Sequence, residues 1–349
     1  MQKSLLESIY KKYPKAEVHF LIYREFQAVQ PFLPEVKKFH FFERQEWSRW
    51  VNQVEVPLLK PVKFLGKLVD ELNAEQFDIV WNWTHQKGSG YLMELIKAPT
   101  KVGLQTIKGQ FNLGNSSDLK TFNNDFLNLD NKGPHYLIHM AKIFNLEKPS
   151  PYPTRNSLNA KKENLICVQP LTSDIKKNWR LHLFREWMKL HQARRPQDQI
   201  IILGSPAERD LLEEEFPLNS IKILNLQDVK NVLTHADLLI STDTAIKHLA
   251  AIQGTQILEL SFGSAQPAKT AAWVDEYNCV IPKVQCWPCS HSRFCTQISH
   301  MCSEELSADD LNNIVMSLIQ KQPHHKLQKH KNDFYLTLTS SGGTHVERN

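Results

Sequence analysis

The second half of the chain alternates short apolar runs with longer amphipathic stretches. Five runs have the length and composition of buried strands: residues 164–170, 198–205, 221–226, 236–240 and 255–262. The stretches between them carry apolar side chains at helical spacing: residues 182–195, 206–216, 227–236 and 243–254. Buried strands that alternate with helices form βαβ units, which build a parallel sheet covered by helices on both faces. The second half is therefore predicted to be a doubly wound α/β domain.

The first half repeats this alternation less regularly. Its strand-like runs are residues 16–23, 37–42, 77–84 and 101–104, and its helix-like stretches are residues 4–14, 64–76, 89–98 and 134–146. Because 349 residues exceed what one hydrophobic core normally holds, two domains are expected. We predict an N-terminal domain over 1–150, a linker over 151–163, a C-terminal domain over 164–320 and a basic tail over 321–349.

The start of the chain departs from the usual order of a doubly wound domain. Such a domain normally begins with a buried strand, whose carboxyl end contributes to the ligand site. This chain begins instead with a helical pattern, QKSLLESIYKKYP at residues 2–14. The prediction is therefore an N-terminal Rossmann-like domain that lacks its first strand.

Charge and hydropathy restrict the class of partner. The net charge is +5, and the basic residues do not gather in the stripe that is typical of nucleic-acid-binding proteins, so no nucleic-acid partner is expected. No apolar stretch reaches the roughly 18 residues of a transmembrane helix, and the first residues lack the apolar core of a signal peptide. The expected location is the cytoplasm, where mild positive charge suits peripheral contact with the anionic inner membrane.

Polar residues follow four of the predicted strands. They are QPLTSDIKKNW at 169–179, GSPAER at 204–209, STDT at 241–244 and FGSAQP at 262–267. Because ligands bind beyond the carboxyl ends of parallel strands, these clusters are expected to lie together. Asp243 or Thr244 alone would be an ordinary helix N-cap, yet the free N–H groups of a helix N-terminus also bind phosphate. Four clusters at one edge of a sheet favour a ligand site.

The same clusters resemble the heptosyltransferases of glycosyltransferase family nine. The C-terminal domain of that family has a K-x-W-P segment after its first strand, then segments of the types G-G-x-x-E, D-T-G-x-x-H-x-A-A-x-x-G-T and F-G-x-T. This chain has KNWR at 177–180, GSPAE at 204–208, DTAIKHLAAIQGT at 243–255 and FGS at 262–264, in the same order. With a weaker match in the first half, the resemblance covers most of residues 1–312.

The resemblance implies two Rossmann-like domains, the GT-B fold, and an inverting transfer of heptose from ADP-heptose. The implied acceptor is the inner core of lipopolysaccharide or a lipid-linked saccharide, and no cofactor is required for catalysis. Lys177 is implied to be catalytic, because an ammonium group neutralises charge on the departing ADP. The implied donor-binding residues are Thr172, Ser173, Lys177, Glu208, Asp243, Thr244, Ala245 and His248.

Two departures from the family pattern bear on catalysis. Ala245 replaces a glycine, which matters if that position needs a positive φ or very close approach to phosphate. The family's expected general base is an aspartate in a Gly-Asp turn, and this turn is expected just before Met1. His85 is the remaining candidate base, and His85 and Lys87 are candidate acceptor contacts. An alternative therefore stays open, a nucleotide-sugar-binding relative that has lost catalysis.

A cysteine-rich insert is predicted over residues 279–302. Cys286, Cys289, Cys295 and Cys302 follow the pattern C-x2-C-x5-C-x6-C, and four thiolates at such spacings can hold structural zinc or an iron–sulfur cluster. Reduced thiols that pack a loop, or a disulfide, are the alternative. A zinc-ribbon nucleic-acid binder is a further hypothesis, but no stripe of aromatic and basic residues surrounds the cysteines.

Overall fold

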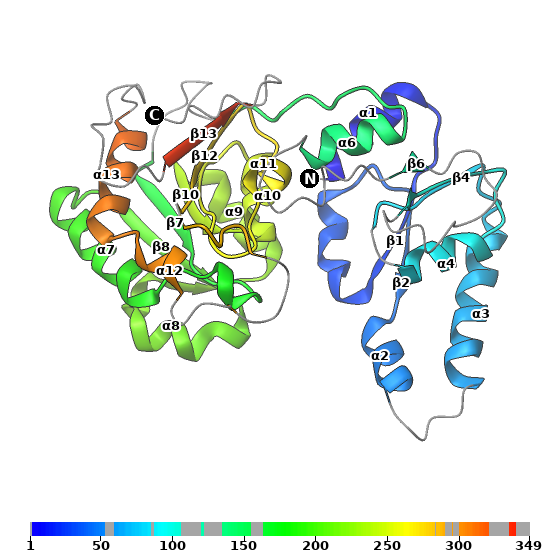
Figure 1. Cartoon of the computed structure of the whole chain (residues 1–349), viewed down its shortest axis with the longest axis horizontal. Coiled ribbons are helices and arrows are strands. Elements are labelled where there is room, and N and C mark those ends of the chain that lie inside the picture. Colours follow the sequence, from blue (N-terminus) through cyan, green and yellow to red (C-terminus); the bar gives the residue numbers. More distant parts are fainter. Residues whose placement is uncertain are drawn as a thin grey trace. The chain divides into compact units, whose positions relative to one another are not determined.

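The computed structural model describes residues 2–52, 59–84, 87–105, 120–121, 135–154, 163–282, 284–289, 295, 300–320 and 335–339. The chain divides into two compact units (Figure 1). The N-terminal unit holds residues 2–127 and 137–149, and the C-terminal unit holds residues 128–136 and the chain from residue 150 onward. No helix within the described ranges is long and apolar enough to cross a membrane.

The C-terminal unit is built on a seven-stranded sheet. Its strands are β7 (Leu165–Gln169), β8 (Gln199–Gly204), β9 (Ile221–Ile223), β10 (Leu238–Thr242), β11 (Gln256–Leu260), β12 (Glu276–Val280) and β13 (Tyr335–Thr339). In space they follow the order β13-β12-β11-β10-β7-β8-β9. Strands β7 to β12 are parallel, and β13 is antiparallel to β12. The predicted parallel sheet is confirmed.

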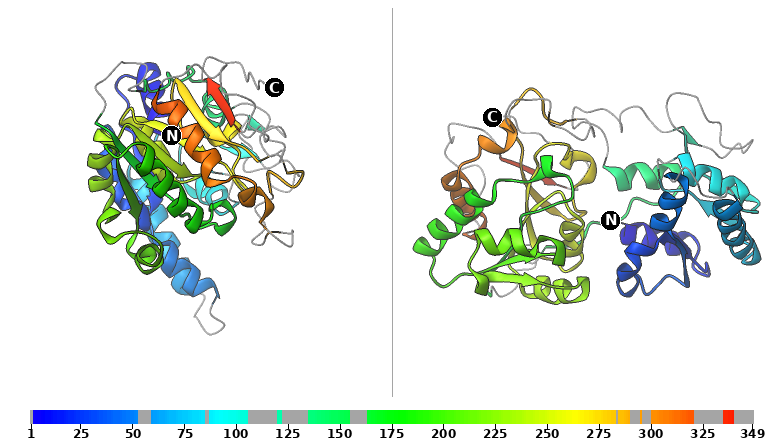
Figure 2. Two further views of the ribbon diagram at one scale, coloured as in Figure 1. Left: turned by 90° about the vertical axis from the view of Figure 1, so that its left-hand side faces the viewer. Right: turned by 90° about the horizontal axis from the view of Figure 1, so that it is seen from below.

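Helices cover the sheet, as the ribbons in Figures 1 and 2 show. They are α7 (Leu181–Arg194), α8 (Arg209–Glu215), α9 (Leu226–His235), α10 (Ala245–Ile252), α11 (Pro267–Thr270), α12 (Met301–Glu304) and α13 (Ala308–Ile319). Every residue of β7, β10 and β11 is buried. Because both faces of these strands are covered, their sequences are continuous apolar runs and not alternating ones.

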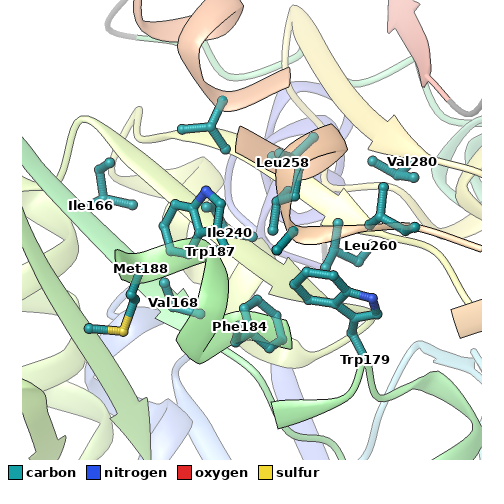
Figure 3. Packing of buried hydrophobic residues seen from close by; sticks show 14 of the residues in the cluster. Ile166, Val168, Trp179, Phe184, Trp187, Met188, Ile240, Leu258, Leu260 and Val280 are labelled. Carbon is teal, nitrogen blue, oxygen red and sulfur yellow. The ribbon is translucent and has the colours of Figure 1, made fainter. Parts of the chain in front are cut away.

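The main hydrophobic core lies between this sheet, α7 and α13 (Figure 3). Phe184 and Trp187 of α7 are fully buried in it, against alternate strand residues such as Val168 and Ile240. Trp179, which precedes α7, packs edge-on against Phe184 with ring centroids 4.7 Å apart. Trp179 belongs to the polar segment after β7, so the core holds that segment in place.

The N-terminal unit contains shorter strands and separate strand pairs. Its elements are α1 (Gln2–Lys12), β1 (His19–Tyr23), the 3-10 helix η1 (Arg24–Phe32), β2 (Lys38–Phe42), α2 (Arg44–Asn52), α3 (Leu59–Ala74), β3 (Ile79–Trp81), α4 (Lys87–Leu95), β4 (Thr100–Val102), β5 (Leu104–Gln105), β6 (Lys120–Thr121) and α6 (Tyr136–Ile143). Strands β1 and β2, β3 and β4, and β5 and β6 form parallel pairs. Among the described residues these three pairs are not hydrogen-bonded to one another.

Three strands of the C-terminal sheet differ from the prediction. Strand β9 ends at Ile223, because Asn225 caps α9 by accepting a hydrogen bond from the backbone N–H of Asp228. Strand β12 was not predicted, since its fully buried Asn278 interrupts the apolar pattern. Strand β13 lies in the predicted basic tail, where alternating residues indicate a short strand before a Gly-Gly turn. The difference is that β13 pairs with β12 and so belongs to the C-terminal sheet.

We expect Phe184→Ala to lower the free energy of unfolding by about 3–5 kcal/mol, because it removes a fully buried aromatic ring and leaves a cavity. Urea denaturation measures the change. Leu218→Ala is the matched control, because 69% of Leu218 is exposed, and it should change stability by less than about 0.5 kcal/mol. Equal effects of the two substitutions would contradict this placement of the core.

Candidate functional site

The strand order of the C-terminal sheet reverses between β7 and β10. From β7 the chain builds outward through β8 and β9, and it then crosses over to build β10, β11 and β12 on the other side. In open α/β sheets, ligands bind beyond the carboxyl ends of the strands at such a reversal. The segments that leave β7 and β10 here are residues 170–180 and 243–244. Both carry residues that were predicted to bind the donor.

A chain of four alternating charges begins at this reversal. The Nζ atom of Lys177 donates to Oδ2 of Asp243 at 2.7 Å. The Nζ atom of Lys247 donates to the other carboxylate oxygen, Oδ1 of Asp243, at 2.5 Å and to Oε2 of Glu259 at 2.7 Å. Asp243 thus lies between two lysines, with one carboxylate oxygen on each. The four side chains together carry no net formal charge.

Burial increases along this chain of charges. The side chains of Lys177 and Asp243 are 17% and 16% exposed, whereas those of Lys247 and Glu259 are fully buried. Glu259 accepts further hydrogen bonds from the hydroxyl groups of Tyr277 and Ser261. Buried charges of this kind persist only when they are paired and hydrogen-bonded. Lys247 and Glu259 therefore form a buried ion pair beneath the more accessible pair of Lys177 and Asp243.

The lysines control the ionisation of Asp243. Burial by itself would raise the pKa of the Asp243 carboxyl, but the charges of Lys247 and Lys177 and their hydrogen bonds hold that pKa well below its ordinary range. Burial would likewise lower the pKa of Lys247, yet Asp243 and Glu259 keep it above the ordinary value. Asp243 and Lys247 are thus both charged at neutral pH.

The helix that follows β10 begins with unused N–H groups. Thr244 is the N-cap of α10, but its side chain makes no capping hydrogen bond. Its hydroxyl instead lies 3.1 Å from the hydroxyl of Ser241. Ala245 is the first helical residue, and its φ is not positive. The alanine therefore fits the backbone here without strain, and the first-turn N–H groups remain available to an anion.

The other predicted donor-binding residues lie around the same edge of the sheet. The Thr172 hydroxyl accepts a hydrogen bond from the backbone N–H of Asp174 at 2.9 Å, and Ser173 is exposed. Glu208 accepts from the backbone N–H of Ser205 at 2.7 Å as half of a capping box. Glu208 thus has a local structural function in addition to any contact with a ligand.

His248 lies one turn into α10. Burial, followed by the charge of Lys247 among other influences, holds its pKa well below the ordinary value, so the ring is neutral at pH 7. Its Nδ1 atom is buried and has no hydrogen-bonding partner among the described residues.

Backbone contacts pack the loops of the site together. Gly263, after β11, has φ +58°, and a Cβ atom at this position would lie 2.4 Å from the carbonyl oxygen of Lys176. The Ser264 hydroxyl donates to Oδ2 of Asp174 at 3.0 Å. The N–H of Cys289 donates to the carbonyl of Gly263 at 2.9 Å. A side chain at position 263 would clash with the backbone of Lys176. Glycine therefore allows the loop after β11 to pack closely against the segment after β7.

Three residues in or near this site are not predicted from the sequence: Lys247, Glu259 and His135. Lys247 is one helical turn after Asp243, a spacing that places both on one face of a helix. Glu259 is a lone carboxylate in an apolar strand, which is a detectable signal of a buried partner. The Nε2 atom of His135 donates to the carbonyl oxygen of Ala271 at 2.9 Å, and its ring packs on Trp273. Burial lowers the pKa of His135 to about 4.

The predicted acceptor contacts and the predicted cysteine metal site stay predictions. His85 lies outside the described residues, and Lys87 is the first residue of α4 in the N-terminal unit. Cys286, Cys289, Cys295 and Cys302 are free thiols. Burial raises the pKa of Cys302 to about 11, and the other three thiols raise it further to a smaller extent. Within the described ranges, however, they do not form a group with all ligand atoms inside 4.8 Å.

A shallow hollow lined in part by Asn164, Arg195 and Asp198 lies at the amino ends of β7, β10 and β11. It is therefore at the edge of the sheet opposite the candidate site.

We expect Lys247→Met to destabilise the protein by about 3–5 kcal/mol, because it leaves Glu259 buried and unpaired. Adding Glu259→Gln removes the uncompensated charge, so the double variant should recover part of the loss. Thermal unfolding measures both, with Lys222→Met, at an exposed position, as the control. The single variant Glu259→Gln completes the comparison. If the loss of stability in the double variant equals the sum of the losses in the two single variants, the pairing is refuted.

Comparisons with known proteins agree with this fold and sequence pattern. The model of glycosyltransferase family 9 (heptosyltransferase) matches residues 65–297. The lipopolysaccharide core heptosyltransferase OpsX of Haemophilus influenzae is 22% identical, with 79% of this chain and 79% of that protein covered.

Solved structures of similar fold cover nearly the whole chain. The E. coli heptosyltransferase WaaC with ADP-2-deoxy-2-fluoro heptose has a TM-score of 0.63 at 14% identity, covering 90% of this chain and 94% of that one. The E. coli ADP-heptose lipopolysaccharide heptosyltransferase II has a TM-score of 0.61 at 15% identity, with coverage of 92% and 95%. A family 9 glycosyltransferase of Veillonella parvula has a TM-score of 0.64 at 15% identity, with coverage of 92% and 93%. These likenesses confirm the predicted GT-B fold, and the chain belongs to glycosyltransferase family 9, the heptosyltransferase family.

Proposed function

We propose that the C-terminal unit binds ADP-heptose and that the protein transfers the heptose, with inversion, to the inner core of lipopolysaccharide. The observation that carries this proposal is the Lys177–Asp243 ion pair, at 2.7 Å across the strand-order reversal. It places a partly exposed cation next to the N-terminus of α10, and both features favour binding of a diphosphate. The similarity to ADP-heptose and lipopolysaccharide heptosyltransferases supports the choice of donor and acceptor.

The two lysines have different functions in this proposal. Lys247 is fully buried and held by Glu259, so it cannot reach a ligand and neutralises Asp243 permanently. Lys177 is partly exposed and can exchange Asp243 for a donor phosphate. It then neutralises the charge that develops on ADP as the bond from heptose to phosphate breaks. Asp243 is left with Lys247 as its partner and can accept hydrogen bonds from sugar hydroxyls.

The neighbouring groups complete the proposed donor site. The first N–H groups of α10, at Ala245 and after it, are assigned to the diphosphate together with Thr244. Thr172 and Ser173 are assigned to the phosphates from the opposite loop, and Glu208 is assigned to the ribose hydroxyls. Glu208 already accepts from Ser205 through Oε2, which leaves Oε1 for the ribose. His248, with a neutral ring and a buried Nδ1, is assigned to the inner end of the same site.

The acceptor is proposed to be the lipopolysaccharide inner core or another lipid-linked saccharide, reached at the cytoplasmic face of the inner membrane. His85 and Lys87, which follow β3, are proposed as acceptor contacts, and their position in the sequence is the support. An inverting transfer also needs a general base near the acceptor hydroxyl, and His85 is the candidate that we name.

Donor binding and turnover are tested separately. Calorimetry with ADP-heptose measures binding, and release of ADP in the presence of core-deficient lipopolysaccharide measures transfer. Binding with transfer supports the proposal, and binding without transfer identifies the non-catalytic relative that the sequence leaves open. Absence of binding would refute the assignment of the donor site.

We expect Lys177→Ala to reduce the rate of ADP release by roughly 100-fold or more, because it removes the cation that stabilises the leaving diphosphate. Lys189→Ala is the matched control, since Lys189 is exposed on α7, and it should leave the rate unchanged. Circular dichroism verifies that both variants are folded. Full activity of Lys177→Ala would disprove the role of this lysine.

A further inference from the structure

Two histidines and a glutamate converge in the N-terminal unit. His19 is the first residue of β1, His40 lies in the middle of β2, and Glu75 directly follows α3. One ligand atom from each of the three lies within 4.8 Å of the other two. His40 pairs with Leu21 in the register of β1 and β2. Leu21 and His19 are two residues apart in β1, and alternate residues of a strand point to the same face, so His19 and His40 share one face of the strand pair.

The distances between these atoms suit a shared metal ion. His19 Nδ1 lies 3.2 Å from His40 Nε2. Two imidazole nitrogens bound to one tetrahedral zinc ion at about 2.0–2.1 Å are about 3.3 Å apart. His19 Nδ1 lies 3.8 Å from Oε2 of Glu75, slightly wider than this geometry requires. Glu75 is at the end of a helix with a partly exposed side chain, so a small rotation of that side chain closes the difference.

A second carboxylate orients His40. Glu71 is one helical turn before Glu75, and its Oε1 atom accepts a hydrogen bond from Nδ1 of His40 at 2.7 Å. This contact assigns the proton to Nδ1 and leaves the lone pair of Nε2 directed at His19. Metal-binding histidines in proteins are commonly held through their other nitrogen by a carboxylate in this manner.

The surroundings of the cluster are also those of a metal site. Only 1% of His40 is exposed, and the ring of Phe77 lies edge-on to both imidazoles at 5.3 and 6.3 Å. Lys38 donates to Oε1 of Glu75, so Oε2 is the oxygen that remains for an ion. Glu71 and Glu75 are 49% and 23% exposed at their side chains, which gives an ion a path from solvent.

A hydrogen bond between the two imidazoles accounts for the 3.2 Å contact by itself. It does not account for the two carboxylates that α3 brings to the same pair of rings, one at the outer nitrogen of His40 and one facing the shared centre. We propose that His19 Nδ1, His40 Nε2 and Glu75 Oε2 bind a divalent transition-metal ion of the zinc type, with water at the fourth position. Binding requires a change of tautomer at His19: the proton between the rings leaves Nδ1 and the Nε2 atom of the same ring takes up a proton, so no net proton is released.

The position of this site indicates its function. His19 lies at the amino end of β1, whereas ligands of open α/β sheets bind beyond the carboxyl ends. The three ligands come from β1, β2 and the end of α3, so an ion would link the strand pair to the helix that covers it. The site is therefore assigned to stability of the N-terminal unit and not to the transfer reaction, and it is independent of the proposed donor site.

The test uses the full chain, stripped of metal with a chelator and titrated with Co²⁺. A site of nitrogen and oxygen ligands gives weak visible d–d bands without the thiolate charge-transfer band that a cysteine site would give. The expected result is one equivalent of this thiolate-free spectrum, together with a rise in melting temperature of several degrees with Zn²⁺. A spectrum with thiolate charge transfer only, or no spectrum, would overturn the proposal.

Variants assign the ligands. His40→Gln and Glu75→Gln should each weaken Co²⁺ binding at least 10-fold, and Glu71→Gln should weaken it by about 10–100-fold through loss of the orienting hydrogen bond. Glu75 and Glu71 are partly exposed, so their variants give an answer even if His40→Gln does not fold. His182→Gln, at an exposed histidine of α7, is the matched control and should bind as the unmodified protein does. Unchanged titration of Glu75→Gln would refute the site.

Discussion

The pairing of β7 with β10 is the constraint on which the C-terminal unit depends. Strand β7 comes first in the chain, yet it lies in the interior of the sheet, with β8 on one side and β10 on the other. The segments that leave β7 and β10 therefore lie at the reversal of strand order, where ligands of open α/β sheets bind. Lys177 and Asp243 belong to these segments and meet at 2.7 Å. Strand order alone thus brings together two residues that are 66 positions apart in the sequence.

The buried charges next to these segments matter for the proposed binding of a diphosphate. A carboxylate at the N-terminus of a helix would repel a diphosphate, and Asp243 is such a carboxylate. Lys247 neutralises the Asp243 carboxylate from the buried side. Because Lys247 and Glu259 are fully buried, this neutralisation does not depend on a ligand. In the proposed donor site, Lys177 is the lysine that changes partners. The proposal thus separates a fixed neutralising charge, Lys247, from an exchangeable one, Lys177, and assigns only the second to the ligand.

The sequence predicts those parts of the fold that local pattern determines. Strands β7 and β10 are buried on both faces, so each is a continuous apolar run, and Asp243 and Thr244 follow the second run directly. Lys247 and Glu259 escaped prediction, because the sequence does not tell which helical face meets which strand residue. Strand β12 is the clearest case: Asn278 and Tyr277 look unsuited to a core, until the hydroxyl of Tyr277 is seen to donate to Glu259. His19, His40 and Glu75 likewise have no motif spacing, and only the register of β1 with β2 and the cover by α3 bring them together.

Both units place a histidine–carboxylate cluster away from the carboxyl ends of their strands. In the C-terminal unit, Asp198 precedes β8 and accepts from Arg195 through both oxygens, at 2.6 and 3.0 Å. Its Oδ2 also lies 2.9 Å from Nε2 of the fully buried His191 of α7, whose other nitrogen contacts Asn312 of α13. This cluster ties α7 and α13 to the amino edge of the sheet. The cluster at His19 has the corresponding place at the amino end of β1. Both clusters thus link helices to strands at the edge of the sheet opposite the carboxyl ends, where ligands of parallel sheets bind. A metal ion at His19, His40 and Glu75 would strengthen such a link without closing the ligand edge.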